Sequence, residues 1–480
     1  MKLSTLVDRS ALAPPQGEAR IGGLTADSRG VTPGMLFAAL PGTRVNGNDF
    51  IAAAIANGAA AVLVEDGSAV GALSVPVIAA EDVRRAFARL AAAFYGRQPE
   101  QVVAITGTSG KTSVAGFVRQ IWLAGGKSAA SIGTLGVVSK DLTIYGSLTT
   151  PDTVRLHELL AQLAGNGVTH AALEASSHGL DQRRLDGIDL AAAAFTNLGR
   201  DHLDYHADQE AYFQAKLGLF TRLLEPGKPV VLDRDEAWSD RVEAAVAARD
   251  MTIFSVGAAG EDFRLEACAP DGAGQILHIG CRGRSLRIRL PLIGRFQVSN
   301  ALIAAGLATV TGMEPEDALR ALETLKGAPG RLDHVGDTPS GAHAFVDYAH
   351  KPEALETVLT TLRPFTRNRL IVVFGAGGDR DHGKRPLMGA IAERCADIAI
   401  VTDDNPRSEN PASIRAAILA AAPSAREIGD RAEAIAAAVA MLRDGDILVV
   451  AGKGHEEGQI VGDTVLPFSD HKVLAEALKS

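Results

Sequence analysis

The sequence predicts an α/β protein built from three domains. Short apolar runs rich in β-branched residues alternate with segments whose apolar residues recur at helical spacing, which is typical of parallel sheets flanked by helices. The chain has 480 residues, more than one hydrophobic core usually supports, so two to four domains are expected. The sequence pattern changes character at two places, and we therefore expect domains at 1–98, 99–328 and 329–480.

Composition narrows the class of protein. The net charge of −9 argues against a nucleic-acid partner, which would need a basic face. No apolar run reaches the roughly 18 residues that a membrane span needs, and the N-terminal stretch is too interrupted for a secretory signal. Cys268, Cys281 and Cys395 lie far apart without a CxxC pair, so they read as reduced thiols. We expect a cytoplasmic protein without membrane insertion, and a monomer.

The first region is rich in alanine and ends in a predicted helix. The segment EDVRRAFARLAAAFYG (81–96) carries apolar residues at helical spacing. Gly96 and Pro99 follow as stop signals. This end of a helix marks the expected boundary of the first domain.

A glycine-rich loop follows the first strand of the second region. QVVAIT (101–106) predicts a buried parallel strand, GTSGKTS (107–113) a phosphate-binding loop, and the segment up to Gly125-Gly126 a helix. Lys111 would reach the outer phosphates of a nucleotide, and the Thr112 hydroxyl would hold Mg²⁺. The loop is two residues shorter than the standard one, since Ile105 occupies the position of its first glycine. The alternative is an ordinary glycine-rich turn. The predicted phosphate loop comprises Gly107, Thr108, Ser109, Gly110, Lys111, Thr112 and Ser113.

Two further strands of this region end near candidate metal ligands. HAALEAS (170–176) contains Glu174, and a carboxylate ending an apolar run is costly unless it is paired or bound to a metal. The alternative is a glutamate exposed at a sheet edge. LAAAAFTN (190–197) precedes His202, which could join or orient a Mg²⁺ shell. Zinc on His202 and His206 is less favoured because no third ligand of the right type is near.

Lys216 lies on an apolar helical stripe with Tyr212, Leu219 and Leu223. Such a lysine usually packs its stem and keeps its ammonium in water. If the amine is instead desolvated, its pKa falls and the neutral form can react with carbon dioxide to give an anionic carbamate. The residues alone leave both interpretations open.

Three strands are predicted in the last region, each followed by a polar loop. They are RLIVVFG (369–375), DIAIVTDDN (397–405) and DILVVAGKG (446–454). Ligands bind at the carboxyl ends of parallel strands, so these loops should line one crevice. The candidate ligand-binding residues in the loops are Arg380, Asp404, Asn405, Pro406, Arg407, Gly452 and Glu456.

Together these motifs resemble the Mur ligase family, the ATP-dependent enzymes that add amino acids to the cytoplasmic peptidoglycan precursor. The motifs that carry the resemblance, in family order along the chain, are TGTSGKTS, EASSHGL, TNLGRDHLDYH, YFQAKLGLF, LIGRFQVSNALIA, PGRLD, DYAHKPEAL, FGAGGDRDHGKRP, TDDNPRSENP and AGKGHE. The resemblance implies an N-terminal UDP-binding α/β domain, a central P-loop ATPase-like parallel sheet and a C-terminal Rossmann-like domain for the incoming amino acid. It implies addition of diaminopimelate to the D-glutamate of a UDP-N-acetylmuramoyl dipeptide through an acyl phosphate.

Several rival functions stay open beside this one. A lysine-adding member of the family or a folylpolyglutamate synthase would share the chemistry. A nucleotide-hydrolysing switch protein would share the phosphate loop alone, and an inactive UDP-sugar sensor would share the fold.

The resemblance also implies roles for individual residues. Lys111, His202 and Lys216 are implied as catalytic, with Lys216 carbamylated. ATP and two Mg²⁺ ions are the implied ligands, with Thr112, Glu174, His202 and Lys216 at the metal site. The residues implied for the rest of the nucleotide are Asn300, Arg331, Asp347 and His350. Those implied for the dipeptide substrate are Ala26, Ser28, Thr149, Thr150, Ser176, Gln182 and Arg184. The sequence departs from the family pattern at Ser109, Gly199, Gln297, Asp333 and Lys351.

Overall fold

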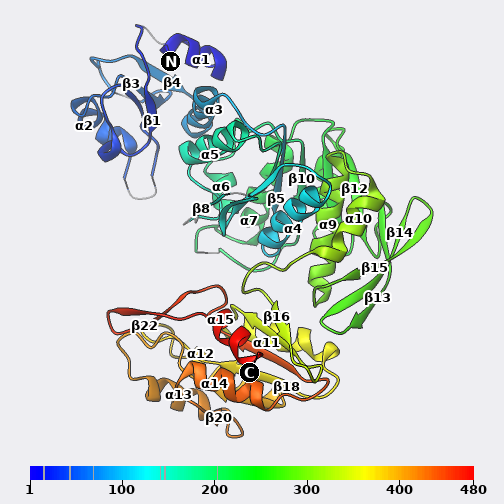
Figure 1. Ribbon diagram of the computed structural model, residues 1–480. Coiled ribbons are helices and arrows are strands. Elements are labelled where there is room, and N and C mark those ends of the chain that lie inside the picture. Colours follow the sequence, from blue (N-terminus) through cyan, green and yellow to red (C-terminus); the bar gives the residue numbers. More distant parts are fainter. Residues whose placement is uncertain are drawn as a thin grey trace. The chain divides into compact units, whose positions relative to one another are not determined.

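The computed structural model describes residues 1–14, 17–42, 45–68, 70–140, 142–144, 148–202 and 204–479 (Figure 1). Its contacts group the chain into two compact units. The first unit comprises Met1–Arg264 and Leu302–Ala318, and the second comprises Leu265–Ala301 and Leu319–Ser480. This division does not test the domain boundaries expected at 98 and 328, which stay predictions.

The N-terminal part of the first unit is a four-stranded parallel sheet in the order β1-β2-β3-β4. The helix predicted over 81–96 is confirmed as α3, whose Asp82 cap accepts a hydrogen bond from the Arg85 amide and whose last turn ends at a left-handed Gly96. The elements of this part are α1 (Leu3–Ser10), β1 (Gly23–Thr25), η1 (Ser28–Gly30), β2 (Met35–Ala38), η2 (Gly47–Phe50), α2 (Ile51–Ala56), β3 (Ala61–Glu65), β4 (Val77–Ala80) and α3 (Val83–Tyr95).

The rest of the first unit is built on a larger sheet with β5 near its middle. Strands β12, β11, β10, β5, β9 and β6 lie side by side in this order and run parallel, and β7 and β8 extend the sheet antiparallel. The three strands predicted in this region are confirmed as β5, β9 and β10, and the predicted helix after the phosphate loop as α4. Because β9 and β10 flank β5, the segments that follow these three strands emerge at one edge of the sheet.

The elements of this part are β5 (Gln101–Thr106), α4 (Lys111–Ala124), β6 (Ala129–Gly133), β7 (Gly136–Ser139), β8 (Thr143–Ile144), α5 (Thr153–Gly165), β9 (His170–Glu174), α6 (Ser177–Asp181), β10 (Ala192–Phe195), α7 (Gln209–Gly218), η3 (Leu219–Leu223), β11 (Pro229–Asp233), α8 (Ser239–Ala247) and β12 (Thr252–Gly257). The helix that carries Lys216 is α7, and it continues into a π-helical turn, η3. Such turns inside helices occur frequently at functional sites.

The second unit contains a six-stranded sheet in the order β16-β17-β21-β18-β19-β20. The strands predicted in the last region are confirmed as β18, β19 and β21, which run parallel with β18 in the middle. Their side chains are fully buried in β18 and β21, which explains why the sequence reads as unbroken apolar runs. The elements of this sheet and its helices are β16 (Asp333–Asp337), β17 (His343–Asp347), α11 (Pro352–Leu362), η5 (Arg363–Phe365), β18 (Leu370–Phe374), α12 (Lys384–Cys395), β19 (Ile398–Val401), α13 (Pro411–Leu419), β20 (Arg426–Glu427), α14 (Arg431–Ala440), β21 (Ile447–Ala451), β22 (Gly458–Val461), β23 (Thr464–Pro467) and α15 (Asp470–Ala477).

The segment between the two sheets contains an antiparallel ribbon and three helical elements. Strands β14 and β15 pair from Gln275↔Leu290 to Cys281↔Arg284. The elements are β13 (Phe263–Asp271), β14 (Gly274–Cys281), β15 (Arg284–Leu290), α9 (Arg295–Val310), α10 (Pro315–Arg320) and η4 (Ala321–Thr324). Across the described ranges, every helix is too short or too polar to cross a membrane.

Candidate active site

The phosphate loop is held in a conformation that requires glycine. Gly107 has φ 147°, and a Cβ placed on it would lie 1.9 Å from the Thr196 hydroxyl. Gly110 has φ 85° and precedes the first residue of α4. The backbone amide of Thr108 donates to the Asn197 carbonyl (2.8 Å), and that of Ser109 to the Asn197 side chain (2.9 Å). The segment after β10 therefore clamps this loop at the N-terminus of a helix, a position that suits an anion.

Two lysine side chains converge on one carbonyl oxygen of this loop. The Nζ of Lys111 donates to the Gly107 carbonyl at 2.8 Å, and the Nζ of Lys216 donates to the same oxygen at 2.7 Å. Lys111 also donates to the Thr108 carbonyl (2.9 Å). The structure thus brings the helical Lys216 directly against the loop, although it lies 109 positions after Gly107 in the sequence.

Lys216 is buried, with 1% of its surface exposed. Burial, together with the neighbouring Lys111 ammonium, lowers the pKa of Lys216 from 10.5 to about 6. Its Nζ lies 4.3 Å from the centre of the Tyr212 ring, and the Tyr212 hydroxyl donates to the Thr108 hydroxyl (3.2 Å). The interpretation that this lysine keeps its ammonium in water is wrong. A largely neutral amine at pH 7 meets the condition for reaction with carbon dioxide.

Glu174 is also buried, with 2% of its surface exposed, so the alternative of an edge-exposed glutamate is wrong. Its carboxylate accepts from the Thr112 hydroxyl (2.9 Å), the Thr134 amide (2.9 Å) and the Thr134 hydroxyl (3.2 Å). Burial raises the pKa of Glu174, although the Lys111 ammonium and these hydrogen bonds oppose the shift. A Cβ on Gly133 would lie 1.9 Å from this carboxylate, so only glycine leaves room for it.

The adjacent Thr112 hydroxyl and Glu174 carboxylate fit a hard divalent cation such as Mg²⁺, which takes oxygen ligands. His202 is not brought together with them by any contact among the described residues. Its side chain is 43% exposed, and the ring Nε2 lies 3.6 Å from the Asp201 carboxylate. Its backbone is in the left-handed region, with φ 53°. Its ring lies 4.8 Å from that of His178 and 6.1 Å from that of Tyr212. Its role at a metal site stays a prediction, as does that of Lys216.

Five of the residues implied for the dipeptide substrate form one hydrogen-bonded cluster beside Glu174. The Thr150 hydroxyl donates to the Glu174 carbonyl (2.8 Å) and accepts from the Ser176 amide (3.0 Å). Arg184 donates to the Thr150 carbonyl (2.7 Å) and to the Gln182 side chain (2.7 Å). The cluster is completed by the Thr149 hydroxyl, 3.1 Å from that of Thr134.

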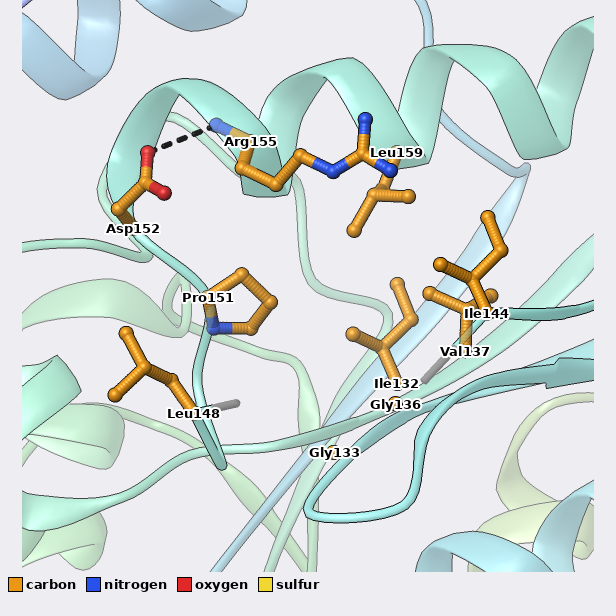
Figure 2. A pocket seen from close by; sticks show the side chains of 10 residues that line it. All are labelled: Ile132, Gly133, Gly136, Val137, Ile144, Leu148, Pro151, Asp152, Arg155 and Leu159. Atoms are coloured by element: carbon orange, nitrogen blue, oxygen red, sulfur yellow. Dashed lines mark hydrogen bonds between the residues drawn. The ribbon is translucent and has the colours of Figure 1, made fainter. Parts of the chain in front are cut away.

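A pocket of about 200 Å³ lies next to this cluster (Figure 2). Its wall is mainly apolar, with Asp152 and Arg155 at the start of α5 as its charged side chains. Ala26 and Ser28 lie elsewhere, at η1, where Asn57 donates to the Ser28 carbonyl (3.1 Å). Within the described ranges, no hydrogen bond joins these two residues to the cluster.

In the second unit, three of the residues implied for the nucleotide surround Tyr348. The Arg331 guanidinium lies 5.1 Å and the His350 ring 4.7 Å from its ring. The buried Asp347 accepts from the amides of Leu332 (2.7 Å) and Ala349 (2.8 Å), while burial raises its pKa. Asn300 lies on α9, where its side chain donates to that of Gln297 (3.3 Å).

The loops after β18, β19 and β21 do meet, as expected. The Arg407 guanidinium donates to the carbonyls of Gly378 (2.8 Å) and Asn405 (3.4 Å), and it makes no ion pair within the described part of the chain. The Asn405 side chain donates to Glu456 (3.0 Å). A Cβ on Gly452 would lie 2.9 Å from the Asp404 carboxylate. Arg380 is exposed and makes no hydrogen bond or ion pair among the described residues, so its part in this crevice stays a prediction.

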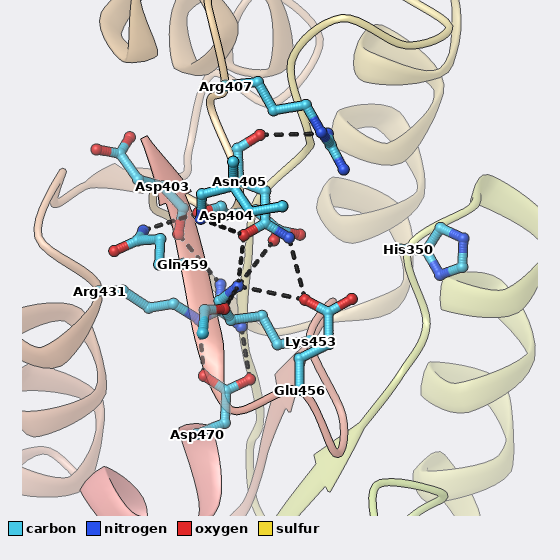
Figure 3. A network of polar contacts seen from close by, with 12 residues as sticks. His350, Asp403, Asp404, Asn405, Arg407, Arg431, Lys453, Glu456, Gln459 and Asp470 are labelled. Atoms are coloured by element: carbon cyan, nitrogen blue, oxygen red, sulfur yellow. Dashed lines mark hydrogen bonds and ion pairs between the residues drawn. The ribbon is translucent and has the colours of Figure 1, made fainter. Parts of the chain in front are cut away.

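A fully buried lysine, Lys453, ties these loops together (Figure 3). Its Nζ donates to the Asn405 side chain (2.8 Å) and the Gly458 carbonyl (2.8 Å), and it lies 3.4 Å from Glu456 and 3.6 Å from Asp404. The Lys453 ammonium and the Asn405 side-chain amide both donate to the same atom of Glu456, Oε2. The Glu456 side chain is 34% exposed, so it is anchored through one oxygen while part of it stays accessible to solvent.

Three models of known protein families match the chain. The Mur ligase family catalytic-domain model matches residues 20–95, the Mur ligase middle-domain model matches 105–308, and the Mur ligase glutamate-ligase-domain model matches 330–454. The chain belongs to the Mur ligase family.

Named relatives of this Mur ligase extend over its whole length. A UDP-N-acetylmuramoyl-L-alanyl-D-glutamate–2,6-diaminopimelate ligase from Brucella melitensis biotype 1 is 57% identical over 479 residues, covering 100% of this chain and 98% of that protein. A solved structure with the same name has 34% identity and a TM-score of 0.76, covering 96% of this chain and 95% of that one. A folylpolyglutamate synthase from Mycobacterium tuberculosis shares the fold at 21% identity and a TM-score of 0.58, and covers 77% of this chain and 92% of that one.

The sequence did not single out Thr134, Asn197, Tyr212 or Lys453 as candidate site residues. Thr134 contacts the candidate metal ligand Glu174, which lies 40 residues away in the sequence. Asn197 contacts Ser109 of the phosphate loop, which lies 88 residues away. Tyr212 lies on the same helical stripe as Lys216, and this spacing could have indicated that the two side chains are in contact. Lys453 stands between two glycines in a loop, and nothing in that context signals burial.

Proposed function

We propose that the protein uses ATP to join meso-diaminopimelate to the D-glutamate of UDP-N-acetylmuramoyl-L-alanyl-D-glutamate. The observation that carries the proposal is Lys216, a buried amine of lowered pKa placed against a phosphate loop beside a buried glutamate. A simple nucleotide switch has no need of such a group. The match of named diaminopimelate ligases along the whole chain supports the choice of substrates.

The reaction needs an electrophilic carboxyl carbon, because an amine does not displace oxide from a carboxylate. Transfer of the γ-phosphoryl group of ATP to the D-glutamate side chain would give an acyl phosphate, which the incoming amine attacks with release of phosphate. The residues of the chain act mainly by alignment and charge neutralisation. Lys111 would hold the transferred group, while Thr150, Ser176 and Arg184 would orient the dipeptide.

Thr112, Glu174, His202 and the carbamate of Lys216 would hold two Mg²⁺ ions. Bound Mg²⁺ neutralises phosphate charge during phosphoryl transfer. The other nucleotide residues would be Asn300, Arg331, Asp347 and His350.

The choice of amine would rest on the crevice in the second unit. Diaminopimelate carries an amine and a carboxylate at both ends, whereas lysine has only an amine at its far end. A guanidinium binds a carboxylate through two parallel hydrogen bonds, so Arg407 favours the substrate with the extra carboxylate. Glu456 would take the ammonium beside it.

Phosphate release from ATP tests the proposal directly. The full chain is mixed with the UDP-linked dipeptide and, in parallel, with diaminopimelate, lysine, ornithine or no amino acid. Release and a new peptide product with diaminopimelate alone are expected. Equal use of lysine would favour the lysine-adding alternative. Release without any precursor would favour a nucleotide switch, and glutamate addition to a folate substrate would favour the synthase.

Thr112→Val should raise the Mg²⁺ concentration for half-maximal activity by about tenfold or more, because valine keeps the shape but removes one oxygen ligand. The measurement is phosphate release against Mg²⁺ concentration. Thr309→Val is the matched control, since the one side-chain hydrogen bond of that hydroxyl among the described residues goes to the Ala305 carbonyl on α9. An unchanged Mg²⁺ dependence in the Thr112 variant would remove the hydroxyl from the metal site.

Lys453→Met should raise the Michaelis constant for diaminopimelate about tenfold, the equivalent of about 1.4 kcal/mol, because Asn405 and Glu456 lose their shared donor. The constant for ATP should stay within about twofold. Lys472→Met is the control, since that lysine faces Glu457 in an exposed pair. A folded Lys453 variant with a normal diaminopimelate constant would contradict the prediction.

A further inference from the structure

A second cluster of ligand-type side chains lies on the β16–β17 hairpin, outside the site described above. It consists of His334, Asp337 and His343, and we call it the hairpin cluster. Both His334 Nε2 (2.7 Å) and His343 Nδ1 (2.6 Å) approach the same oxygen, Oδ1 of Asp337. One ligand atom from each of the three residues lies within 4.8 Å of the other two.

A bulge in β16 is what brings these three side chains to one face. In a regular strand, residues 334 and 337 are three apart and point to opposite faces. The pairing Asp337↔His343 and Gly336↔Ala344 shifts by one residue before His334↔Phe345, so β16 carries one extra residue. His334 is thereby placed opposite Phe345, which shares a face with His343. Bulges commonly re-aim a side chain in this way.

The two imidazole rings are held by further contacts. The His334 ring lies 5.1 Å from that of Phe345, and a Cβ placed on Gly272 would be 3.5 Å from His343 Nε2. The His343 side chain is 18% exposed and that of Asp337 is 52% exposed. The His334 side chain is 31% exposed, so solvent reaches both this ring and the carboxylate and gives an ion a path of entry.

We propose that the hairpin cluster binds a divalent transition-metal ion of the Zn²⁺ type. Two imidazole nitrogens and one carboxylate oxygen suit Zn²⁺, Co²⁺ or Ni²⁺, whereas Mg²⁺ sites are built mostly from oxygen ligands. Tetrahedral ligands at about 2.0–2.1 Å from Zn²⁺ lie roughly 3.3 Å apart. The Asp337 oxygen would move about 0.6–0.7 Å away from each nitrogen, with water as the remaining ligand. The ion would cross-link the two strands at the end of β17 remote from Asp347.

Cobalt titration of the full chain tests the site. Excess Mg²⁺ is present throughout, so that oxygen-ligand sites such as Thr112 and Glu174 are saturated. The wild-type protein is expected to bind one Co²⁺ more than Asp337→Asn or His343→Gln, with visible absorption that Zn²⁺ abolishes. His278→Gln, a change to an exposed histidine on β14, is the matched control and should keep that ion.

A third substitution, His334→Gln, keeps the proposal testable if one of these variants fails to fold. His334→Gln keeps Asp337 bonded to His343 and should weaken Co²⁺ binding at least tenfold. Equal stoichiometry and affinity in the wild type and in this variant would overturn the proposal, and so would the absence of Co²⁺ binding to the wild type. The cluster would then be two imidazoles hydrogen-bonded to one carboxylate.

Discussion

Replacing Lys216 by methionine should lower kcat by about 1,000-fold or more, which corresponds to about 4 kcal/mol of lost transition-state stabilisation. Methionine fills the buried space that the lysine stem occupies, so the loss should come from the missing amine rather than from a cavity. The Michaelis constants for the UDP-linked dipeptide and diaminopimelate should change little. Steady-state phosphate release with each substrate varied in turn measures both effects.

The pKa of Lys216 gives this prediction a pH dependence. With a pKa of about 6, the amine is mostly neutral above pH 6 and becomes protonated as pH falls through that value. Only the neutral form reacts with carbon dioxide, so carbamate should form at pH 7–8 and be lost toward pH 5. Carbon-13 NMR of protein equilibrated with labelled bicarbonate should show one carbamate signal that is absent from Lys216→Met.

Lys127→Met is the control for non-specific effects, since Lys127 is an exposed residue in the turn after α4. Normal turnover in Lys216→Met would end the carbamate proposal. A carbamate signal that survives in that variant would assign the label to another amine, with the same consequence.

Much of the fold could be predicted because its strands are buried on both faces. The runs that form β5, β9 and β18 contain no polar residue between their ends, so their sequence identifies them without knowledge of their neighbours. The phosphate loop could equally be identified from the sequence, since glycine, lysine and threonine follow β5 in the order of the known motif. The positions of the residues that follow these strand ends were therefore predictable.

Contacts between distant segments were not predictable. Nothing in the local sequence places Thr134 against Glu174 or Lys453 against Asn405, because strand order and loop packing decide both. The bulge in β16 likewise depends on its pairing with β17. The burial of Lys216 was ambiguous for the same reason: the helical stripe identified a packed face, whereas the distance from Nζ to the phosphate loop came only from the fold.

Arg407→Ala should raise the Michaelis constant for diaminopimelate about 100-fold, because loss of a paired guanidinium costs about 3 kcal/mol. The backbone and the side chain of Arg407 are both constrained. Its φ of 51° is a conformation that non-glycine residues adopt rarely, and its guanidinium donates to two backbone carbonyls. The constant for ATP should stay within about twofold, since this crevice does not contain the phosphate loop. Arg443→Ala, which removes an arginine outside the crevice, is the control.

Lysine as an alternative substrate separates recognition from general damage. Lysine lacks the far carboxylate, so Arg407→Ala should hardly weaken lysine binding. Lysine should even bind better to the variant if the unpaired guanidinium opposes lysine binding in the wild type. The preference for diaminopimelate over lysine, measured as the ratio of kcat/KM values, should therefore fall by about 100-fold. A variant that loses both substrates equally would show that Arg407 holds the loop together rather than choosing the substrate. Discrimination would then have to reside in Glu456 and its partners, and the Lys453 variant would become the more informative one.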